Sequence, residues 1–142
     1  MGLAGNDKQL MKFEYDFAVD GGAQGAIALR QVAGNALEAG VHITDIYVIA
    51  ETLLTSAGTP TVTLGNTTDA DGYAEDIYAL VSGSGKAALR AGEVAGALVW
   101  DDTNDHAILY SPLVADDLDL NLTVGTADLT AGKLVVYVEF VK

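Results

Sequence analysis

The stretch Val41–Gly65, VHITDIYVIAETLLTSAGTPTVTLG, constrains the fold more than any other part of the chain. It contains two apolar runs that are rich in β-branched and aromatic residues, which suit a pleated, half-buried surface. The small residues and the proline of Ser56–Pro60 lie between the two runs and predict a turn. We therefore expect Val41–Gly65 to form the central hairpin of an all-β domain.

The first of these runs changes its alternation part-way. Val41 and Ile43 are separated by one polar residue, but the apolar positions then shift by one residue at Asp45–Ile46. Because strand side chains alternate between two faces, a single shift indicates one extra residue in the strand. The sequence thus predicts a β-bulge at this point.

The clearest alternation lies in Met11–Val19, MKFEYDFAV. Its apolar and aromatic residues occupy every second position, with Lys12, Glu14 and Asp16 between them, which predicts a strand. This face concentrates aromatic residues in a chain in which they make up only 7%. We expect it to anchor either the core or a contact between subunits.

Strand patterns recur along the rest of the chain. Ala26–Val32 predicts a strand, and Leu118–Val124 alternates cleanly between apolar and polar residues. Ala97–Trp100 and His106–Tyr110 flank a polar loop and predict another hairpin. Leu134–Val141 is a nearly continuous β run. Since both ends of the chain are strand-like, we expect them to pair or to lie in facing sheets.

One segment, Ala74–Val81, fits either a strand or a short helix with Asp71 as its N-cap.

The other runs are separated by glycine, aspartate and asparagine turns. Together they predict an all-β, single-domain β-sandwich or jelly-roll-like barrel with about eight strands and at most one short helix. Residues 1–10 are small and polar, so we expect a flexible N-terminal arm before a domain over residues 11–142.

The charge balance excludes several kinds of partner. Seven basic residues against 20 acidic ones give a net charge of −13. We expect no nucleic acid and no anionic membrane as partners, because phosphate contacts need clustered lysine and arginine. No apolar stretch is long enough to span a bilayer, and no signal peptide is expected. The charge favours solubility and repulsion between copies, or alternatively steering toward a basic partner or cations.

The sequence supplies no catalytic set. The absence of cysteine excludes a disulfide framework, a thiolate metal site and a thiol nucleophile. The two histidines, His42 and His106, lie far apart in the sequence, and there is no G-x-S-x-G motif. The glycines of Gly21–Gly25 do not match the phosphate-binding pattern G-x-G-x-x-G. We therefore assign no catalytic and no cofactor-binding residue and expect no enzyme.

Three acidic clusters offer the oxygen atoms that calcium prefers. The first lacks the full twelve-residue calcium-loop pattern. We interpret all three as solvated turn residues and assign no metal site; a cation that bridges subunits is the alternative. The clusters are Asp69, Asp71, Glu75 and Asp76; Asp101, Asp102, Asn104 and Asp105; and Asp116, Asp117 and Asp119.

Three pieces of the sequence occur in the order FAVDGGAQGAIALR, ITDIYVIAETLLTSAGTPTVTLGNTTDADGY and LTAGKLVVYVEFVK. In this order they resemble small structural proteins of tailed bacteriophages, namely capsid decoration (cement) proteins and related head components. The resemblance covers residues 13–142. It implies a β-sandwich or jelly-roll domain that forms a homotrimer on the outer surface of the virion, binds the major capsid protein and stabilises the lattice. It carries over no catalytic, cofactor or metal residue.

Two other functions remain open at this point. A carbohydrate-binding module, or a head-fibre or tail adhesion module, could share the β-sandwich shape. A carbohydrate-binding module would need exposed aromatic side chains, for which Trp100, Tyr73, Tyr78 and Tyr110 are the candidates. A small hydrolase is the third possibility, but the sequence contains no motif for it.

Overall fold

The computed structural model describes residues 9–34, 40–82, 88–90, 100–101, 106–107 and 119–141. Strands predominate among them, and both helices are four residues long. In chain order the elements are β1 (Gln9–Asp16), α1 (Phe17–Asp20), β2 (Gly25–Ala28), β3 (Arg30–Ala33), β4 (His42–Ser56), β5 (Thr61–Gly65), α2 (Tyr78–Val81), β6 (Ala88–Arg90), β7 (Trp100–Asp101), β8 (His106–Ala107), β9 (Asn121–Gly125) and β10 (Leu129–Val141). The all-β prediction is confirmed, with two short helices in the described residues where at most one was expected.

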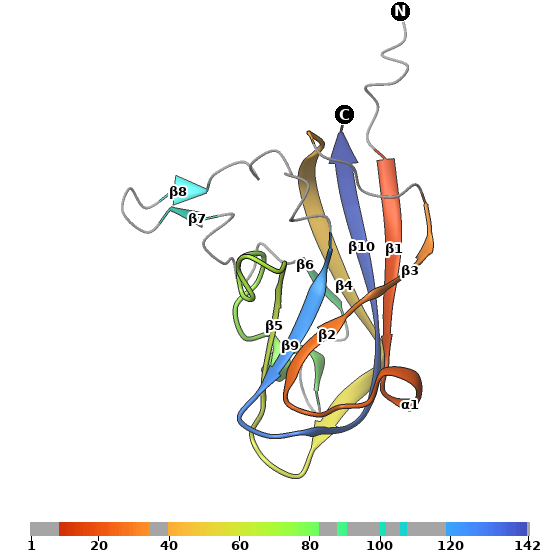
Figure 1. Cartoon of the computed structure of the whole chain (residues 1–142), viewed down its shortest axis with the longest axis vertical. Helices are drawn as coiled ribbons and strands as arrows, with labels where there is room; N and C mark the ends of the chain where they lie inside the picture. Colours follow the sequence, from red (N-terminus) through yellow and green to blue (C-terminus); the bar gives the residue numbers. More distant parts are fainter. Residues whose placement is uncertain are drawn as a thin grey trace, which may run out of the picture.

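The strands form two main layers. One sheet has the strand order β3-β1-β10-β4-β6, and the other has the order β2-β9-β5. Figure 1 shows the smaller sheet lying across the larger one. Buried side chains from both sheets, among them Tyr15, Ile46, Leu64, Leu122 and Phe140, form one hydrophobic cluster between the layers. This arrangement is a β-sandwich with a single core.

The first and last strands pair with each other, which is the first of the two arrangements that the sequence allowed. β1 runs antiparallel to β10 in an unbroken register from Gln9 opposite Phe140 to Asp16 opposite Lys133. β10 therefore lies at the centre of the larger sheet, with β1 on one side and β4 on the other. The pairing joins residues from opposite ends of the chain within one sheet.

The predicted hairpin over Val41–Gly65 is wrong, because its two strands belong to different sheets. β4 pairs with β10 and β6, whereas β5 pairs with β9. The turn at Ser56–Pro60 therefore carries the chain from one layer to the other. A turn of small residues permits either connection, and β10, with 13 residues, offers the 15-residue β4 a partner of similar length.

The predicted bulge in β4 is confirmed. Phe140 lies opposite Ile43, and the preceding residue of β10, Glu139, lies opposite Asp45, so Thr44 is the extra residue. Ile43 and Ile46 are both buried in the core although they are three residues apart. The Asp45 carboxylate accepts a hydrogen bond from the Ile46 N–H at 2.9 Å and thereby satisfies a backbone group at the irregularity.

The predicted strand Met11–Val19 is confirmed only as far as Asp16. The Asp16 carboxylate accepts a hydrogen bond from the Ala18 N–H at 3.0 Å and caps the helix α1. A side chain that bonds its neighbouring backbone in this way competes with the strand ladder. As a result, the core receives Met11, Phe13 and Tyr15, whereas Val19 is 65% exposed.

The turn that follows α1 is fastened by Tyr15. Its hydroxyl donates a hydrogen bond to the Gly21 carbonyl at 2.6 Å. Burial, together with the negative charges of Asp20 and Asp16, raises the pKa of Tyr15 to about 12. The phenol therefore stays neutral in the folded protein at a pH where an exposed tyrosine ionises.

This shift predicts alkaline destabilisation with a defined sign. The Tyr15 pKa is higher in the folded than in the unfolded chain, so its contribution is complete below pH 10 and is lost as pH rises toward 12. Tyr15→Phe should cost about 1 kcal/mol at pH 7, from the lost hydrogen bond, and should lose less stability than wild type between pH 10 and 12. Urea unfolding at these pH values measures both effects. An equally steep alkaline loss in the variant would contradict the assignment.

The predicted strand Ala26–Val32 is in fact two strands in different sheets. β2 pairs with β9 in the smaller sheet, and β3 pairs with β1 in the larger one. The chain crosses between the layers at Leu29, which is buried and donates its N–H to the Leu120 carbonyl at 2.9 Å. Leu29 is the buried residue of this segment, whereas most of β2 and β3 on either side of it is exposed, so the alternation of Ile27 and Leu29 did not continue into β3.

The segment Ala74–Val81, which the sequence allowed to be either a strand or a short helix, contains a part of each. Ala74 forms an antiparallel bridge with Leu64, and only Tyr78–Val81 is helical. The predicted N-cap at Asp71 is wrong, since the helix begins after Ile77. The Asp76 carboxylate instead accepts hydrogen bonds from the Tyr78 and Val62 N–H groups at 3.0 and 2.9 Å.

The remaining predicted strands agree with the structure where they can be compared. Leu120, Leu122 and Val124 are buried on β9 and at its start, while Leu118 lies outside the described residues. Trp100 pairs with Ala107, which confirms the second hairpin.

β1 begins at Gln9, and residues 1–8 lie outside the described residues, so the N-terminal arm stays a prediction. In the part of the chain that the structure describes, neither helix is long enough to cross a membrane.

Candidate functional site

The histidines occupy separate elements of the fold. His42 is exposed at the first position of β4. His106 lies in β8, in register with Asp101. Across the described residues, no group of three or more histidine and acidic side chains is arranged to hold a metal ion.

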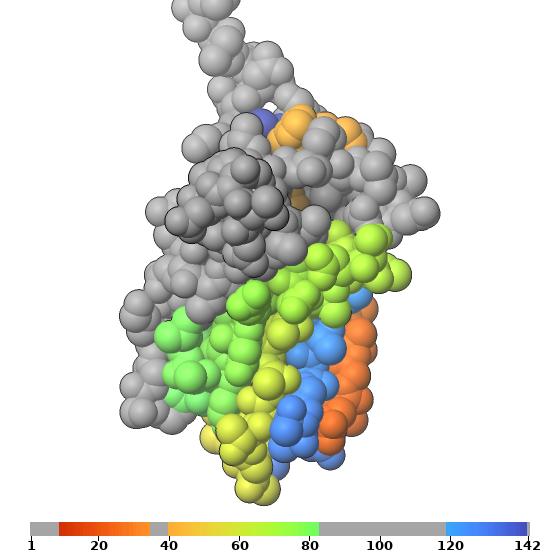
Figure 2. All heavy atoms as spheres, turned by 90° about the vertical axis from the view of Figure 1, so that its left-hand side faces the viewer, coloured from red at the N-terminus to blue at the C-terminus, as the bar shows by residue number. Residues whose placement is uncertain are grey.

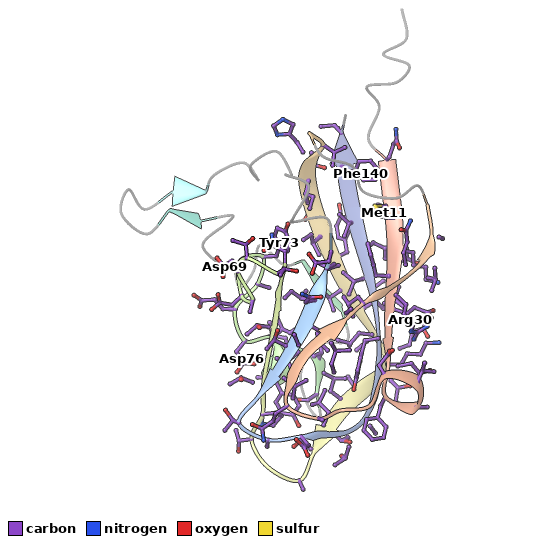
Figure 3. All side chains as sticks on the ribbon, in the orientation of Figure 1. Met11, Arg30, Asp69, Tyr73, Asp76 and Phe140 are labelled. Atoms are coloured by element: carbon purple, nitrogen blue, oxygen red, sulfur yellow. The ribbon has the colours of Figure 1, made fainter. Side chains whose placement is uncertain are left out.

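The first acidic cluster lies on a segment that is organised by Asn66. This side chain is buried, and its carbonyl oxygen accepts hydrogen bonds from the Thr68 and Asp69 N–H groups at 3.1 and 2.9 Å. Partial burial and a hydrogen bond with Asp71 raise the pKa of Asp69. Figure 3 shows Asp69, Tyr73 and Asp76 on the same side of the molecule. The hydrogen bonds that Asn66 and Asp76 accept connect this segment to its own backbone and to β5.

The other two clusters are described only in part. Asp102, Asn104, Asp105, Asp116 and Asp117 lie outside the described residues.

Asp119 belongs to the third cluster and is a structural residue. It accepts hydrogen bonds from the Asn121 amide at 2.9 Å and from both the hydroxyl and the N–H of Thr67. Burial alone would raise the pKa of Asp119, but these hydrogen bonds hold it below its ordinary value. This carboxylate joins the start of β9 to the segment after β5.

The aromatic residues considered for a carbohydrate site are not exposed where their side chains are described. Tyr73 is 3% exposed, and its hydroxyl accepts a hydrogen bond from the Asn66 amide at 3.4 Å. Tyr78 is half-buried against the core. Trp100 lies in β7, and Tyr110 lies outside the described residues. Tyr73 and Tyr78 therefore do not form the exposed platforms that the alternative needs.

The larger sheet carries a second set of apolar side chains on its outer face, away from the core. Val135 is only 2% exposed, and it does not belong to the core cluster. In register, Val135 lies opposite Ile49, and Tyr137 lies opposite Tyr47. On the other side of β10, Tyr137 lies opposite Lys12. We call Leu10, Lys12, Tyr47, Ile49, Val135 and Tyr137 the outer-sheet patch.

This patch concentrates exposed apolar surface. Leu10 and Ile49 are 50% and 39% exposed, and Val32 on the neighbouring edge strand β3 is 44% exposed. Apart from Val19 in α1, these are all the exposed large hydrophobic residues in the described part of the chain. Sequence reasoning missed the patch, because it expected polar side chains opposite the core-facing residues of β1 and did not foresee that β10 would lie between β1 and β4.

An ion-pair network borders the patch at one end. Arg30 donates two hydrogen bonds to the Asp20 carboxylate, both at 3.1 Å, and lies 4.0 Å from Glu14. Lys133 lies 3.9 Å from Glu14 and 3.3 Å from Glu51. Lys12, in contrast, makes no ion pair with any other residue that the structure describes.

The Asp20–Arg30 pair predicts acid sensitivity. Burial alone would raise the pKa of Asp20. Hydrogen bonds from Arg30 and from the Asp16 N–H, together with the positive charge of Arg30, outweigh burial and lower the pKa of this carboxyl from its ordinary value. The Asp20 carboxylate therefore makes its full contribution to folding stability above the unfolded-state pKa, and this contribution is lost as pH falls through the lower folded-state pKa. Asp20→Asn should cost about 1 kcal/mol at pH 7 and less at pH 2.5, as measured by urea unfolding. An undiminished cost at the lower pH would show that charge is not the cause.

Comparison with known proteins adds a fold similarity. The sequence matches no protein-family model and no curated protein. The fold is similar to a chain of the cyanophage Pam1 capsid asymmetric unit, with a TM-score of 0.67 and 14% sequence identity over 99% of this chain and 88% of that chain. At this identity the similarity shows a shared fold, and it confirms at that level the resemblance of the sequence to phage capsid proteins.

A second solved structure is more distant. It is the acidic stable capsid structure of Helicobacter pylori bacteriophage KHP30, at a TM-score of 0.47 and 16% identity over 96% of this chain and 90% of that chain.

Proposed function

We propose that this chain is a non-enzymatic structural protein of a bacteriophage virion, located on the outer surface of the capsid. In this role it binds the major capsid protein as an oligomer, a trimer by the family resemblance, and stabilises the lattice. The observation that carries the proposal is the fold similarity to a chain of the Pam1 capsid asymmetric unit over 99% of the residues. The sequence resemblance to decoration proteins supports the same function independently of the fold.

The physical mechanism is preferential binding to the assembled lattice. A protein that binds assembled shells but not free subunits stabilises the shell by RT ln(1 + [L]/Kd), which is about 2.7 kcal/mol when its concentration is a hundred times Kd. An oligomer adds avidity, because each further subunit binds at a high effective concentration. This function needs a rigid domain with two kinds of contact surface, and it needs no reaction chemistry.

The proposal is tested with particles of the phage that encodes this chain. Particles that lack the protein are mixed with increasing amounts of purified protein, and the temperature at which they release DNA is followed with a fluorescent dye. We expect saturable binding and a higher release temperature. Failure to bind, or binding without any change in release temperature, would overturn the stabilising role. Heat-denatured protein serves as the control for nonspecific adsorption.

A further inference from the structure

The two sides of the sandwich differ in their basic residues, although both carry acidic ones. The strands of the larger sheet include Glu14, Asp16, Asp45, Glu51 and Glu139. Among the described residues, the basic residues are Lys12, Arg30, Arg90 and Lys133, and all four lie on strands of the larger sheet. The smaller sheet and the segments 66–82 and 119–128 contain no basic residue but carry Asp69, Asp71, Glu75, Asp76, Asp119 and Asp128. Figure 3 shows Arg30 on the opposite side of the molecule from Asp69 and Asp76.

The outer face of the smaller sheet, which Figure 2 shows as adjacent bands of β5, β9 and β2, differs from the outer-sheet patch in its side chains as well. Its outward positions carry small or polar residues, such as Thr63, Thr123 and Ala26. No large hydrophobic residue of the described part of this sheet is exposed. The exposed apolar residues Leu10, Val32 and Ile49 and the basic residues Lys12, Arg30 and Lys133 therefore come from the same sheet.

We propose that the outer-sheet patch is the surface on which a second copy of this chain docks. The inference rests on the proposed function, because it identifies the contact by which the proposed oligomer forms. Aromatic and apolar side chains at the centre with few charges are the composition of protein interfaces. In the patch, Tyr47, Ile49 and Tyr137 supply this centre, and Lys12 is its only charged member.

Charge complementarity identifies the occupant. A second copy carries 20 acidic and 7 basic residues, so most of its surface repels another copy. Lys12 lacks an ion pair with any described residue and lies beside apolar neighbours. A carboxylate of the approaching copy would be partly desolvated there, so the Lys12 ammonium would attract it more strongly than in water. Asp71 and Glu75, which are exposed on the side without basic residues, are carboxylates of the required kind.

The contact is expected to be heterologous. The six residues of the patch include no carboxylate, and the acidic residues next to them are engaged: Glu14 with Arg30 and Lys133, Glu139 with the Thr44 hydroxyl at 2.8 Å, and Asp45 with the Ile46 N–H. The neighbouring copy must therefore supply its carboxylate from a different surface. Heterologous contacts close into rings or extend into filaments, so the oligomer should have either a fixed mass or a mass that grows with concentration.

Sedimentation equilibrium of the purified chain tests the inference, with three variants measured beside the wild type. Ile49→Glu adds one negative charge to the patch, and Lys12→Glu replaces its one positive charge by a negative one. Val19→Glu adds one negative charge at an exposed apolar position of α1, outside the patch and outside the smaller sheet, and serves as the matched control for Ile49→Glu. We expect the first two variants to raise the dissociation constant of self-association about 30-fold or more and the control to leave it within about threefold. Urea unfolding of each variant confirms that it is folded.

Salt concentration separates the charge contribution of Lys12 to self-association from the apolar contribution of Ile49. High salt screens charge, so the effect of Lys12→Glu should shrink at 1 M NaCl, whereas the effect of Ile49→Glu should remain. If Ile49→Glu does not fold, Lys12→Glu still decides the outcome, because its side chain lies outside the core. Equal effects of Val19→Glu and Lys12→Glu would overturn the inference, since general repulsion would then explain both.

Two further outcomes separate this inference from the proposed function. A wild-type chain that stays monomeric at every concentration overturns the second-copy contact, while binding to phage particles tests the virion role separately. If Ile49→Glu leaves the solution mass unchanged but abolishes binding to particles, the patch contacts the shell. That result would also overturn the inference, but it would support the proposed function.

Discussion

Replacing Phe140 by alanine should destabilise the protein by about 3–5 kcal/mol, the usual cost of removing a fully buried aromatic side chain. Phe140 is 0% exposed and lies on β10, between β1 and β4. Removing its ring leaves a cavity that the two neighbouring strands restrict from collapsing. The loss is measured as the difference in free energy of unfolding between Phe140→Ala and wild type in urea.

Tyr137 supplies the matched control for this change. It lies three residues earlier on the same strand, but on the outer face and only partly buried. Tyr137→Ala should cost about 1–2 kcal/mol, because part of the removed surface is already in water and no cavity forms in the core. If the two variants were equally unstable, the assignment of Phe140 to the core and Tyr137 to the outer face would be wrong.

Gly65→Ala should be the second strongly destabilising change, with a cost of about 3 kcal/mol or more. A Cβ atom at Gly65 would lie 2.0 Å from the Asp69 carbonyl oxygen and 2.5 Å from the Ala70 carbonyl carbon. Both are backbone atoms, so the segment after β5 would have to move. That segment also contains Asn66, whose hydrogen bonds to Thr68 and Asp69 hold its present path.

Gly125→Ala is the control for Gly65→Ala. A Cβ atom at Gly125 would lie 2.6 Å from the Thr61 hydroxyl, the end of a side chain that can rotate away. Its cost should stay at about 1 kcal/mol. Thermal unfolding followed by circular dichroism measures both variants, and a Gly65→Ala protein as stable as Gly125→Ala would show that residues 66–70 do not pack against Gly65 as described.

Local pattern was sufficient for the strands with clear alternation. Met11, Phe13 and Tyr15 are buried as their spacing predicted, and so are Leu122 and Val124. The shift in alternation at Asp45 marked the bulge in β4 correctly. These predictions succeeded because the burial of one strand face depends on the two-residue period of the strand itself.

Strand ends required information that periodicity does not contain. The apolar spacing of Met11–Val19 continues past Asp16, but the hydrogen bond from the Ala18 N–H to the Asp16 carboxylate ends the strand there. The Asp16 N–H in turn donates to the Asp20 carboxylate at 2.8 Å. Aspartate at these positions was a visible signal, since its side chain competes for nearby backbone groups.

The candidate contact surface could not be derived from the sequence. The residues of the outer-sheet patch come from β1, β4 and β10, and they are neighbours only because β10 pairs with both of the others. Read singly, Tyr47 and Tyr137 resemble core residues of apolar strands. Their position outside the core depends on strand partners that are distant along the chain.

The sequence by itself determined the all-β class, most strand faces, the bulge and the strong negative charge, because each depends on residue type and short-range spacing. Only the tertiary structure decided that β4 and β5 lie in different sheets, that Ala26–Val32 crosses between layers, and that the described basic residues and the exposed apolar residues of the strands come from one sheet. The physical reason is that a strand can satisfy its hydrogen bonds with any suitable partner. The choice among partners is made by the packing of the whole core.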